Sequence, residues 1–190
     1  MINIIDYYSK VLVRCRAIFC ALLYGVHFIK LGQGVKIRGA QYFQIGRNVS
    51  VGDFCWIEAV YKYKSFHYSP ALIIGNGVAL SDLCHISCAY RITIGNDCLL
   101  GSKIYIGDHN HGSLKVDRLD LETPPAKRPL DDIEPIIIGD NCFICDGAVI
   151  LAGTTLARGS MVGANSVVKL KVDRPALIAG APAKIIKYLT

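Results

Sequence analysis

Aliphatic residues recur every six positions along much of the chain, and this spacing constrains the fold more than any other feature. The longest unbroken series is Ile138, Ile144, Ile150, Leu156, Val162 and Val168, and the same spacing recurs in the triplets Ile45, Val51, Ile57; Ile74, Leu80, Ile86; and Ile94, Leu100, Ile106. Glycine often follows the aliphatic residue, and a small or slender residue stands four positions after it. An α-helix repeats every 3.6 residues and a strand every two, so neither alone explains a period of six.

A coil of short strands joined by tight turns accounts for this period. In such a coil the aliphatic residue points inward and stacks on its equivalent one turn away, and the slender residue also faces inward. Neighbouring rungs pair like strands of a sheet, about 4.8 Å apart. Each coil contacts only its neighbours, so several are needed before the core closes. We therefore expect an all-β solenoid.

The interruptions of the repeat all fall at one phase. The steps longer than six run from Ile37 to Ile45, Ile57 to Ile74, Ile86 to Ile94 and Ile106 to Ile138. If three hexads make one turn, every excess lies at the same corner. The insertions Glu58–Ile73 and Gly107–Ile137 should then leave one edge, with bases roughly 10 Å apart. Insertions on one face of a repeat array are often its binding face.

The eight cysteines are expected to be free thiols rather than disulfides or zinc ligands. Cys55, Cys84, Cys98 and Cys142 occupy the slender inward position, where cysteine behaves as a small hydrophobic residue. Cys142 and Cys145 form a CxxC pair, but the repeat points Cys142 inward and Cys145 outward. No second pair at zinc spacing is present, so no metal is expected.

The N-terminal segment has two interpretations. Ala17–Phe28 is apolar but shorter than the roughly 20 residues of a spanning helix, and Lys10, Arg14 and Arg16 precede it. It is either a helix packed on the end of the domain or an amphipathic helix on the inner membrane face. Met1–Tyr8 lacks the basic region and cleavage site of a signal peptide, so the cytoplasm is expected. The net charge of +6 comes without a basic block, which argues against nucleic acid binding.

Three longer segments resemble the hexapeptide acyltransferases. They are Ile106–Gly112 (IGDHNHG), the block Ile136–Val168 and the ending Ile178–Lys187 (IAGAPAKIIK). The resemblance covers roughly Leu31–Thr190 and is closest to the sugar O-acetyltransferases of bacterial O-antigen, capsule and colanic-acid synthesis. It implies a left-handed parallel β-helix, a homotrimer with active sites between subunits, acetyl-CoA as donor, and a sugar or lipid-linked glycan as acceptor.

Spacing and resemblance together divide the chain into three parts. We expect an N-terminal helical segment at 1–30 and a β-helix at 31–170, with loop insertions at 58–73 and 107–137. The last part, 171–190, is expected to form a short helix or tail.

Acyl transfer to a hydroxyl needs a base, because a sugar hydroxyl is a poor nucleophile until its proton is removed. His109 aligns with the catalytic histidine of the resembled family, and an imidazole titrates in the right range. The residues Asp108, Asn110, His111, His85 and Ser81 are expected around the acceptor. Asp108 either orients the imidazole or caps a turn. The galactoside enzymes use an asparagine near the position of Ser81, so this chain departs from the pattern there.

Contacts to coenzyme A are implied by the same resemblance. Ala164 and Asn165 match the residues that bond the pantetheine arm, and Lys169 lies nearby. Lys184 and Lys187 match the basic residues that meet the phosphates, although they are equally explained as solvated side chains.

The aromatic side chains of the first insertion also have two interpretations. They either bind a sugar, or cover the open end of the coil or a subunit contact; the residues are Tyr61, Tyr63, Phe66, His67 and Tyr68. Alternative functions are a serine- or antibiotic-type acetyltransferase, a γ-carbonic-anhydrase-like protein and a non-catalytic solenoid. The carbonic anhydrase would need three convergent histidines, and His109 and His111 are too close in sequence for that family.

Overall fold

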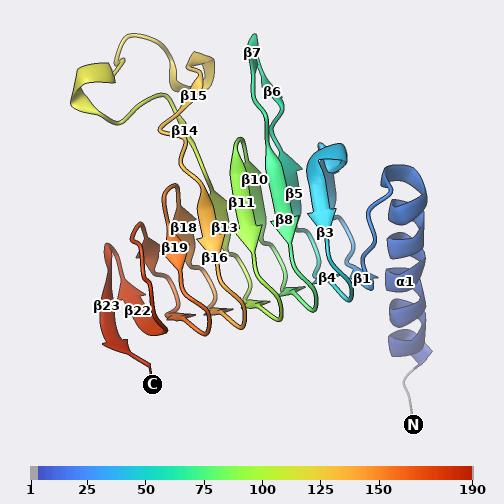
Figure 1. Cartoon of the computed structure of the whole chain (residues 1–190). Helices are drawn as coiled ribbons and strands as arrows, with labels where there is room; N and C mark the ends of the chain where they lie inside the picture. The colour runs from blue at the N-terminus through green and yellow to red at the C-terminus, as the bar shows by residue number, and fades with distance from the viewer. Residues whose placement is uncertain (1–3, 190) are drawn as a thin grey trace.

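The computed structural model describes residues 4–189 and shows a chain wound through three parallel sheets in a fixed order (Figure 1). We call these walls sheets A, B and C. Sheet A contains β1 (Lys30–Leu31), β4 (Ser50–Val51), β9 (Ala79–Leu80), β12 (Leu99–Leu100), β17 (Phe143–Ile144), β20 (Met161–Val162), β22 (Ala176–Gly180) and β23 (Ala183–Tyr188). Sheet B contains β2 (Lys36–Arg38), β5 (Trp56–Ala59), β10 (His85–Cys88), β13 (Tyr105–Gly107), β18 (Val149–Leu151) and β21 (Val167–Val168). Sheet C contains β3 (Phe43–Ile45), β8 (Ala71–Ile74), β11 (Arg91–Ile94), β16 (Ile136–Ile138) and β19 (Thr155–Leu156).

The inward positions are those that the six-residue period predicts. Ile57, Ile86 and Ile106 lie opposite one another on neighbouring rungs of sheet B and are at most 1% exposed. The slender positions are equally buried, with Cys55 and Ala148 both 0% exposed. The predicted core is therefore confirmed, and it accounts for most of the buried cysteines.

A ladder of polar side chains holds the corner between sheets C and A. The Asp140 Oδ1 accepts the backbone N–H of Asn96 at 2.7 Å, and the Asn96 Oδ1 accepts that of Asn76 at 2.9 Å. The Asn76 Oδ1 in turn accepts the N–H of Arg47 at 2.8 Å. Gly95 is required here because a Cβ would lie 2.5 Å from the backbone nitrogen of Asp140.

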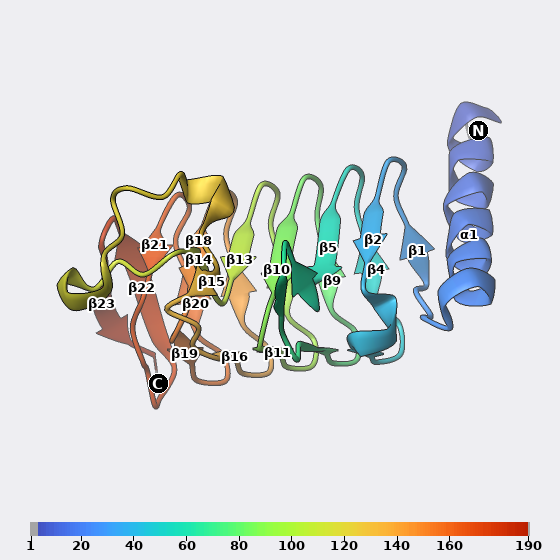
Figure 2. The same ribbon diagram turned by 90° about the horizontal axis from the view of Figure 1, so that it is seen from above.

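Both insertions leave the corner between sheets B and C, as the spacing predicts (Figures 1 and 2). The first follows β5 and forms the hairpin of β6 (Lys62–Tyr63) and β7 (Phe66–His67). The second follows β13 and contains the antiparallel pair β14 (Asn110–His111) and β15 (Leu130–Asp131). Short 3-10 turns lie at Ala40–Tyr42, Val116–Arg118 and Pro125–Lys127.

The N-terminal helix α1 (Ile4–Tyr24) lies beside the first coil (Figure 1). Ala17 and Cys20 are buried, and the Arg16 Nε donates a hydrogen bond to the Leu31 carbonyl at 3.1 Å. Within residues 4–189, no helix is long and apolar enough to cross a membrane. Met1–Asn3, which the predicted helical segment included, lie outside the described residues.

The C-terminal segment forms strands rather than a short helix or unpaired tail. β22 pairs in parallel with β20, with Ile178 opposite Val162, so it continues the coil. β23 then folds back antiparallel on β22 and ends sheet A.

Candidate active site

The side chains of Asp108 and His109 contact each other at the start of the second insertion. The Asp108 carboxylate is fully buried and accepts the backbone N–H groups of Ala89, Tyr90 and Arg91 at 2.7, 2.8 and 2.8 Å. The same carboxylate lies 2.8 Å from the His109 Nδ1. The two roles considered for Asp108 therefore coexist: it caps the turn of the coil before it and orients the imidazole.

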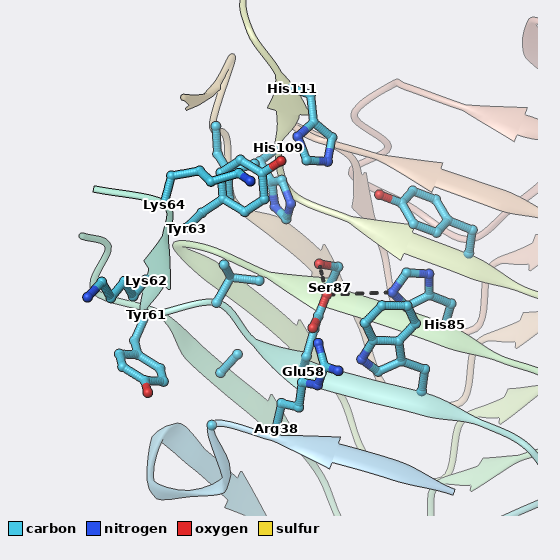
Figure 3. Close-up of a pocket in the computed structure, with 16 residues that line it drawn as sticks. Arg38, Glu58, Tyr61, Lys62, Tyr63, Lys64, His85, Ser87, His109 and His111 are labelled. Carbon is cyan, nitrogen blue, oxygen red and sulfur yellow. Dashed lines mark hydrogen bonds and ion pairs between the residues drawn. The ribbon is translucent and has the colours of Figure 1, made fainter. Parts of the chain in front are cut away.

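This arrangement selects one tautomer of the neutral His109 ring. A carboxylate that accepts three N–H groups also accepts from the imidazole, so in the neutral ring the proton lies on Nδ1 and the lone pair on Nε2. The His109 side chain is 6% exposed, and its ring lines the pocket (Figure 3). No partner of Nε2 is found within the described part of the chain. The geometry suits a base that receives a proton from a molecule in the pocket.

The pocket has a volume of about 770 Å³ and lies over the outer face of sheet B, between the two insertions (Figure 3). Three elements provide its walls. Trp56, Glu58, His85 and Ser87 come from sheet B, Tyr61 and Tyr63 from the first insertion, and His109 and His111 from the second.

The two insertions contact each other above the pocket. The Tyr63 ring meets the His111 ring edge-on, with centroids 5.0 Å apart, and the Tyr63 hydroxyl donates to the Ala126 carbonyl at 2.8 Å. The Tyr68 hydroxyl accepts the N–H of Leu130 at 2.8 Å. Burial lowers the pKa of His111, and the charge of His109 adds to this. At least part of the aromatic insertion therefore serves to hold the second insertion in place.

His85 lines the pocket with its ring held between two others. It stacks on Trp56 with centroids 4.5 Å apart and meets Tyr105 edge-on at 5.3 Å. Lys36 and Arg38 lie over the Trp56 ring, at 5.6 and 5.2 Å from its centroid. These contacts run along sheet B and leave the His85 ring little freedom to turn.

Sequence reasoning missed Glu58 as an individual site residue. Its Oε1 accepts a hydrogen bond from the Ser87 Oγ at 3.0 Å and lies 3.8 Å from the His85 Nε2. Burial alone would raise the pKa of Glu58, but the nearby His85 ring, the hydrogen bond from Ser87 and the charge of Arg38 lower it overall. A signal was present, because residues directly after the inward Ile37, Ile57 and Ile86 must share one outer face.

Comparison with known proteins identifies the repeat. Residues 135–169 match the model of the bacterial transferase hexapeptide (six repeats), and residues 91–107 match that of the hexapeptide repeat of succinyl-transferase. Both segments of the chain therefore carry hexapeptide repeats.

Two of its relatives are named for the synthesis of bacterial polysaccharides. This hexapeptide-repeat chain is 39% identical over 118 residues to WbbJ of Escherichia coli, described as a lipopolysaccharide biosynthesis O-acetyl transferase. The match covers 61% of this chain and 60% of WbbJ, less than two thirds of either. It is also 26% identical over 180 residues to WcaF of Escherichia coli, described as a colanic acid biosynthesis acetyltransferase, covering 94% of this chain and 77% of WcaF.

A solved structure shows the shared fold. A variant of the N-acyltransferase AntD from Bacillus cereus, in complex with dTDP-4-amino-4,6-dideoxyglucose and coenzyme A, superposes with a TM-score of 0.65 at 17% identity. The superposition covers 89% of this chain and 88% of AntD. The fold of this hexapeptide-repeat protein is thus the left-handed parallel β-helix that the resemblance implies.

The remaining predicted site residues of the hexapeptide-repeat chain do not line this pocket. Ser81 and the pair Ala164 and Asn165 lie at turns between sheets A and B, a different corner from His109. Lys169 follows β21 at the B–C corner, with its Nζ 3.9 Å from the Glu134 Oε1. Two lysines, Lys184 and Lys187, are exposed on β23. Asn110 is half-buried in β14 and is not among the residues that line the pocket.

No metal centre is found in residues 4–189, where no three His, Cys, Asp or Glu side chains are grouped to hold an ion. The cysteines described are all unpaired, with Cys142 buried and Cys145 partly exposed, as the repeat predicts.

Proposed function

We propose that the protein transfers an acetyl group from acetyl-CoA to a sugar hydroxyl in the synthesis of a bacterial surface polysaccharide. The observation that carries this is the His109–Asp108 pair, held at 2.8 Å, at the wall of a pocket large enough for a sugar. The names of WbbJ and WcaF support the same chemistry, and the coenzyme A in AntD supports the donor.

In the proposed reaction, the His109 Nε2 removes the proton of the acceptor hydroxyl as its oxygen attacks the thioester carbonyl. A new C–O bond forms, and the tetrahedral intermediate then loses the coenzyme A thiolate as the C–S bond breaks. The imidazolium returns its proton to the leaving sulfur. Asp108 stabilises the imidazolium between these steps, because its carboxylate lies against Nδ1. No acyl-enzyme forms on this route.

We further propose that the active protein is a homotrimer with its active sites between subunits. Within one chain, Ser81 and Asn165 lie at the A–B corner and His109 lies at the B–C corner. If Asn165 contacts coenzyme A as the resemblance implies, a neighbouring subunit would bring that corner to His109. Light scattering would measure the mass of the assembly.

A peripheral contact with the inner face of the membrane is the last part of this proposal. Leu12, Ile18, Phe19, Leu22 and Leu23 of α1 are all more than half exposed. Arg14 on the same helix is also exposed, which suits an anionic lipid surface. Vesicle sedimentation with and without anionic lipid tests this part.

The activity itself is tested by following coenzyme A release from acetyl-CoA in the presence of a panel of glycosides, nucleotide sugars and lipid-linked glycans. The His109→Ala variant provides the blank. Acetylated product from the wild type alone supports the proposal. Release that no sugar stimulates, or that the variant matches, would refute it.

A further inference from the structure

Glu58 lies in a row of outward side chains that runs along sheet B beneath the two insertions. The strand register places Arg38, Glu58 and Ser87 on successive rungs, followed by Gly107 at the foot of the second insertion. Gly107 has no side chain, and the Tyr105 hydroxyl occupies the space that a Cβ there would take. Figure 3 shows the Glu58 carboxylate inside the pocket, with dashed lines to Ser87 and His85.

The contacts of Glu58 use only one of its two carboxylate oxygens. Oε1 accepts from the Ser87 Oγ at 3.0 Å and faces the His85 Nε2 at 3.8 Å. Oε2 has no hydrogen bond or ion pair within residues 4–189. Arg38 does not form an ion pair with it, since the guanidinium lies over the Trp56 ring at 5.2 Å. The side chain is only 15% exposed, so Oε2 has limited access to water.

The reaction proposed above leaves this carboxylate without a role. Its pKa is lowered, so it is ionised at neutral pH and is a weaker base than an ordinary glutamate. An ionised carboxylate is an acceptor only, and a poorly hydrated one is costly without donors. A donor from within the pocket, either water or a bound ligand, therefore completes the hydrogen bonding of Oε2.

The aromatic surroundings favour a hydroxyl as that donor. A sugar can stack on an open ring face, but both faces of Trp56 are covered, by His85 on one side and by Lys36 and Arg38 on the other. The floor of the pocket therefore offers a sugar little stacking surface at Trp56. Recognition there has to come from hydrogen bonds.

We propose that Glu58 orients the acceptor, with Oε2 accepting a hydrogen bond from a second hydroxyl of the sugar while His109 faces the hydroxyl that is acetylated. The inference rests on the proposed function and adds a substrate class, since the acceptor needs at least two hydroxyls. Glu58 acts by positioning, and it determines which hydroxyl reaches His109. The hydrogen bond from Ser87 holds Oε1, and Oε2 is left for the acceptor.

Binding in a host that cannot react separates this inference from the proposed function. The host is His109→Ala, and the probes are the methyl glycosides of glucose, galactose, mannose and N-acetylglucosamine, titrated without acetyl-CoA by saturation-transfer NMR. At least one glycoside should bind the host. Adding Glu58→Gln should weaken it about 10- to 100-fold, as expected for the loss of a hydrogen bond to a charged group. The deoxy analogue that lacks the second hydroxyl should bind both proteins equally.

Kinetics with the His109-containing protein provide the second measurement. Glu58→Gln should raise the acceptor KM at least tenfold, leave the acetyl-CoA KM within twofold, and spread acetylation over more than one hydroxyl. Ser87→Ala is the matched control, since it removes one partner of Oε1 and should have a smaller effect. The inference is overturned if no glycoside binds the host, or if Glu58→Gln binds the glycoside and its deoxy analogue as the host does. Equal changes in both KM values would show a structural role instead.

Discussion

The Tyr68 hydroxyl accepts the backbone N–H of Leu130 at 2.8 Å, so one side chain of the first insertion fixes the point where the second insertion turns back toward the coil. Leu130 begins β15, which pairs with β14 and so holds His111 in register. Contacts between segments 62 residues apart therefore shape the pocket wall.

Replacing Tyr68 by Phe should loosen the second insertion without disturbing the coil. The change removes the hydrogen bond from the Leu130 N–H, worth about 1 kcal/mol, and the longer one at 3.4 Å to the Leu130 carbonyl. Amide hydrogen exchange should accelerate at residues 110–111 and 130–131 and stay unchanged in sheet C. Tyr61→Phe is the control, because its hydroxyl makes no hydrogen bond within the described residues. Equal exchange in the two variants would show that the Tyr68 contact does not hold the loop.

Replacing His109 by Ala should lower kcat by roughly two to four decades, the usual effect of losing a general base. The affinity for coenzyme A should change little. Steady-state kinetics and calorimetric titration with coenzyme A measure the two quantities separately. A variant with wild-type kcat would remove His109 from the reaction.

Replacing Asp108 by Asn should damage both the reaction and the fold. The amide no longer holds the Nδ1 proton in place, and kcat should fall by about two to four decades. The amide nitrogen also cannot accept the N–H groups that its oxygen accepted, either that of Ala89 or those of Tyr90 and Arg91, so the melting temperature should fall. In a His109→Ala background the same change should lower stability and leave kcat unaltered. A further loss of kcat there would contradict the orienting role.

The lowered pKa of Glu58 predicts a pH-dependent contribution to stability. The folded state binds fewer protons than the unfolded state between the lowered pKa and the ordinary value of about 4.3. The stabilising contribution is therefore complete above the ordinary pKa and is lost as the pH falls through the folded pKa. Urea unfolding from pH 7 to pH 3 should show the difference between wild type and Glu58→Gln shrinking at the acid end. A difference that is constant with pH would contradict this.

The cysteines should differ in reactivity according to their places in the coil. Cys15 is exposed and Cys145 partly exposed, and the other six are buried. Burial, helped by the charge of Asp108, raises the pKa of Cys88 to about 12 and so disfavours its reactive thiolate. A thiol reagent should label Cys15 rapidly and Cys145 slowly in the folded protein, and all eight after unfolding in urea. Fewer than eight without reductant would indicate a disulfide.

The sequence was sufficient to predict the coil because one local rule repeats. Inward residues such as Ile57 and Ile106 are set by a spacing that can be counted, and the corner of the insertions follows from the same count. The contact of Tyr63 with His111 was beyond such counting, because it depends on how two irregular loops fold against each other.

The outward residues of sheet B were predictable but were not predicted. The row containing Glu58 and Ser87 follows from the register as directly as the core does. The aliphatic period identifies only the inward residues. The roles of the outward side chains depend on charge and hydrogen bonding, which the period does not report. The C-terminal hairpin was not predictable in this way, since the repeat no longer governs a strand that folds back antiparallel.

The α1 helix also sets where the stack of coils can end. A parallel coil exposes unpaired backbone groups at its first rung, and such an edge can pair with another molecule and grow into a fibre. Here Arg16 occupies the Leu31 carbonyl, and Ala17 and Cys20 pack against the first coil. The helix thus covers the end of the coil at which a second molecule could otherwise pair.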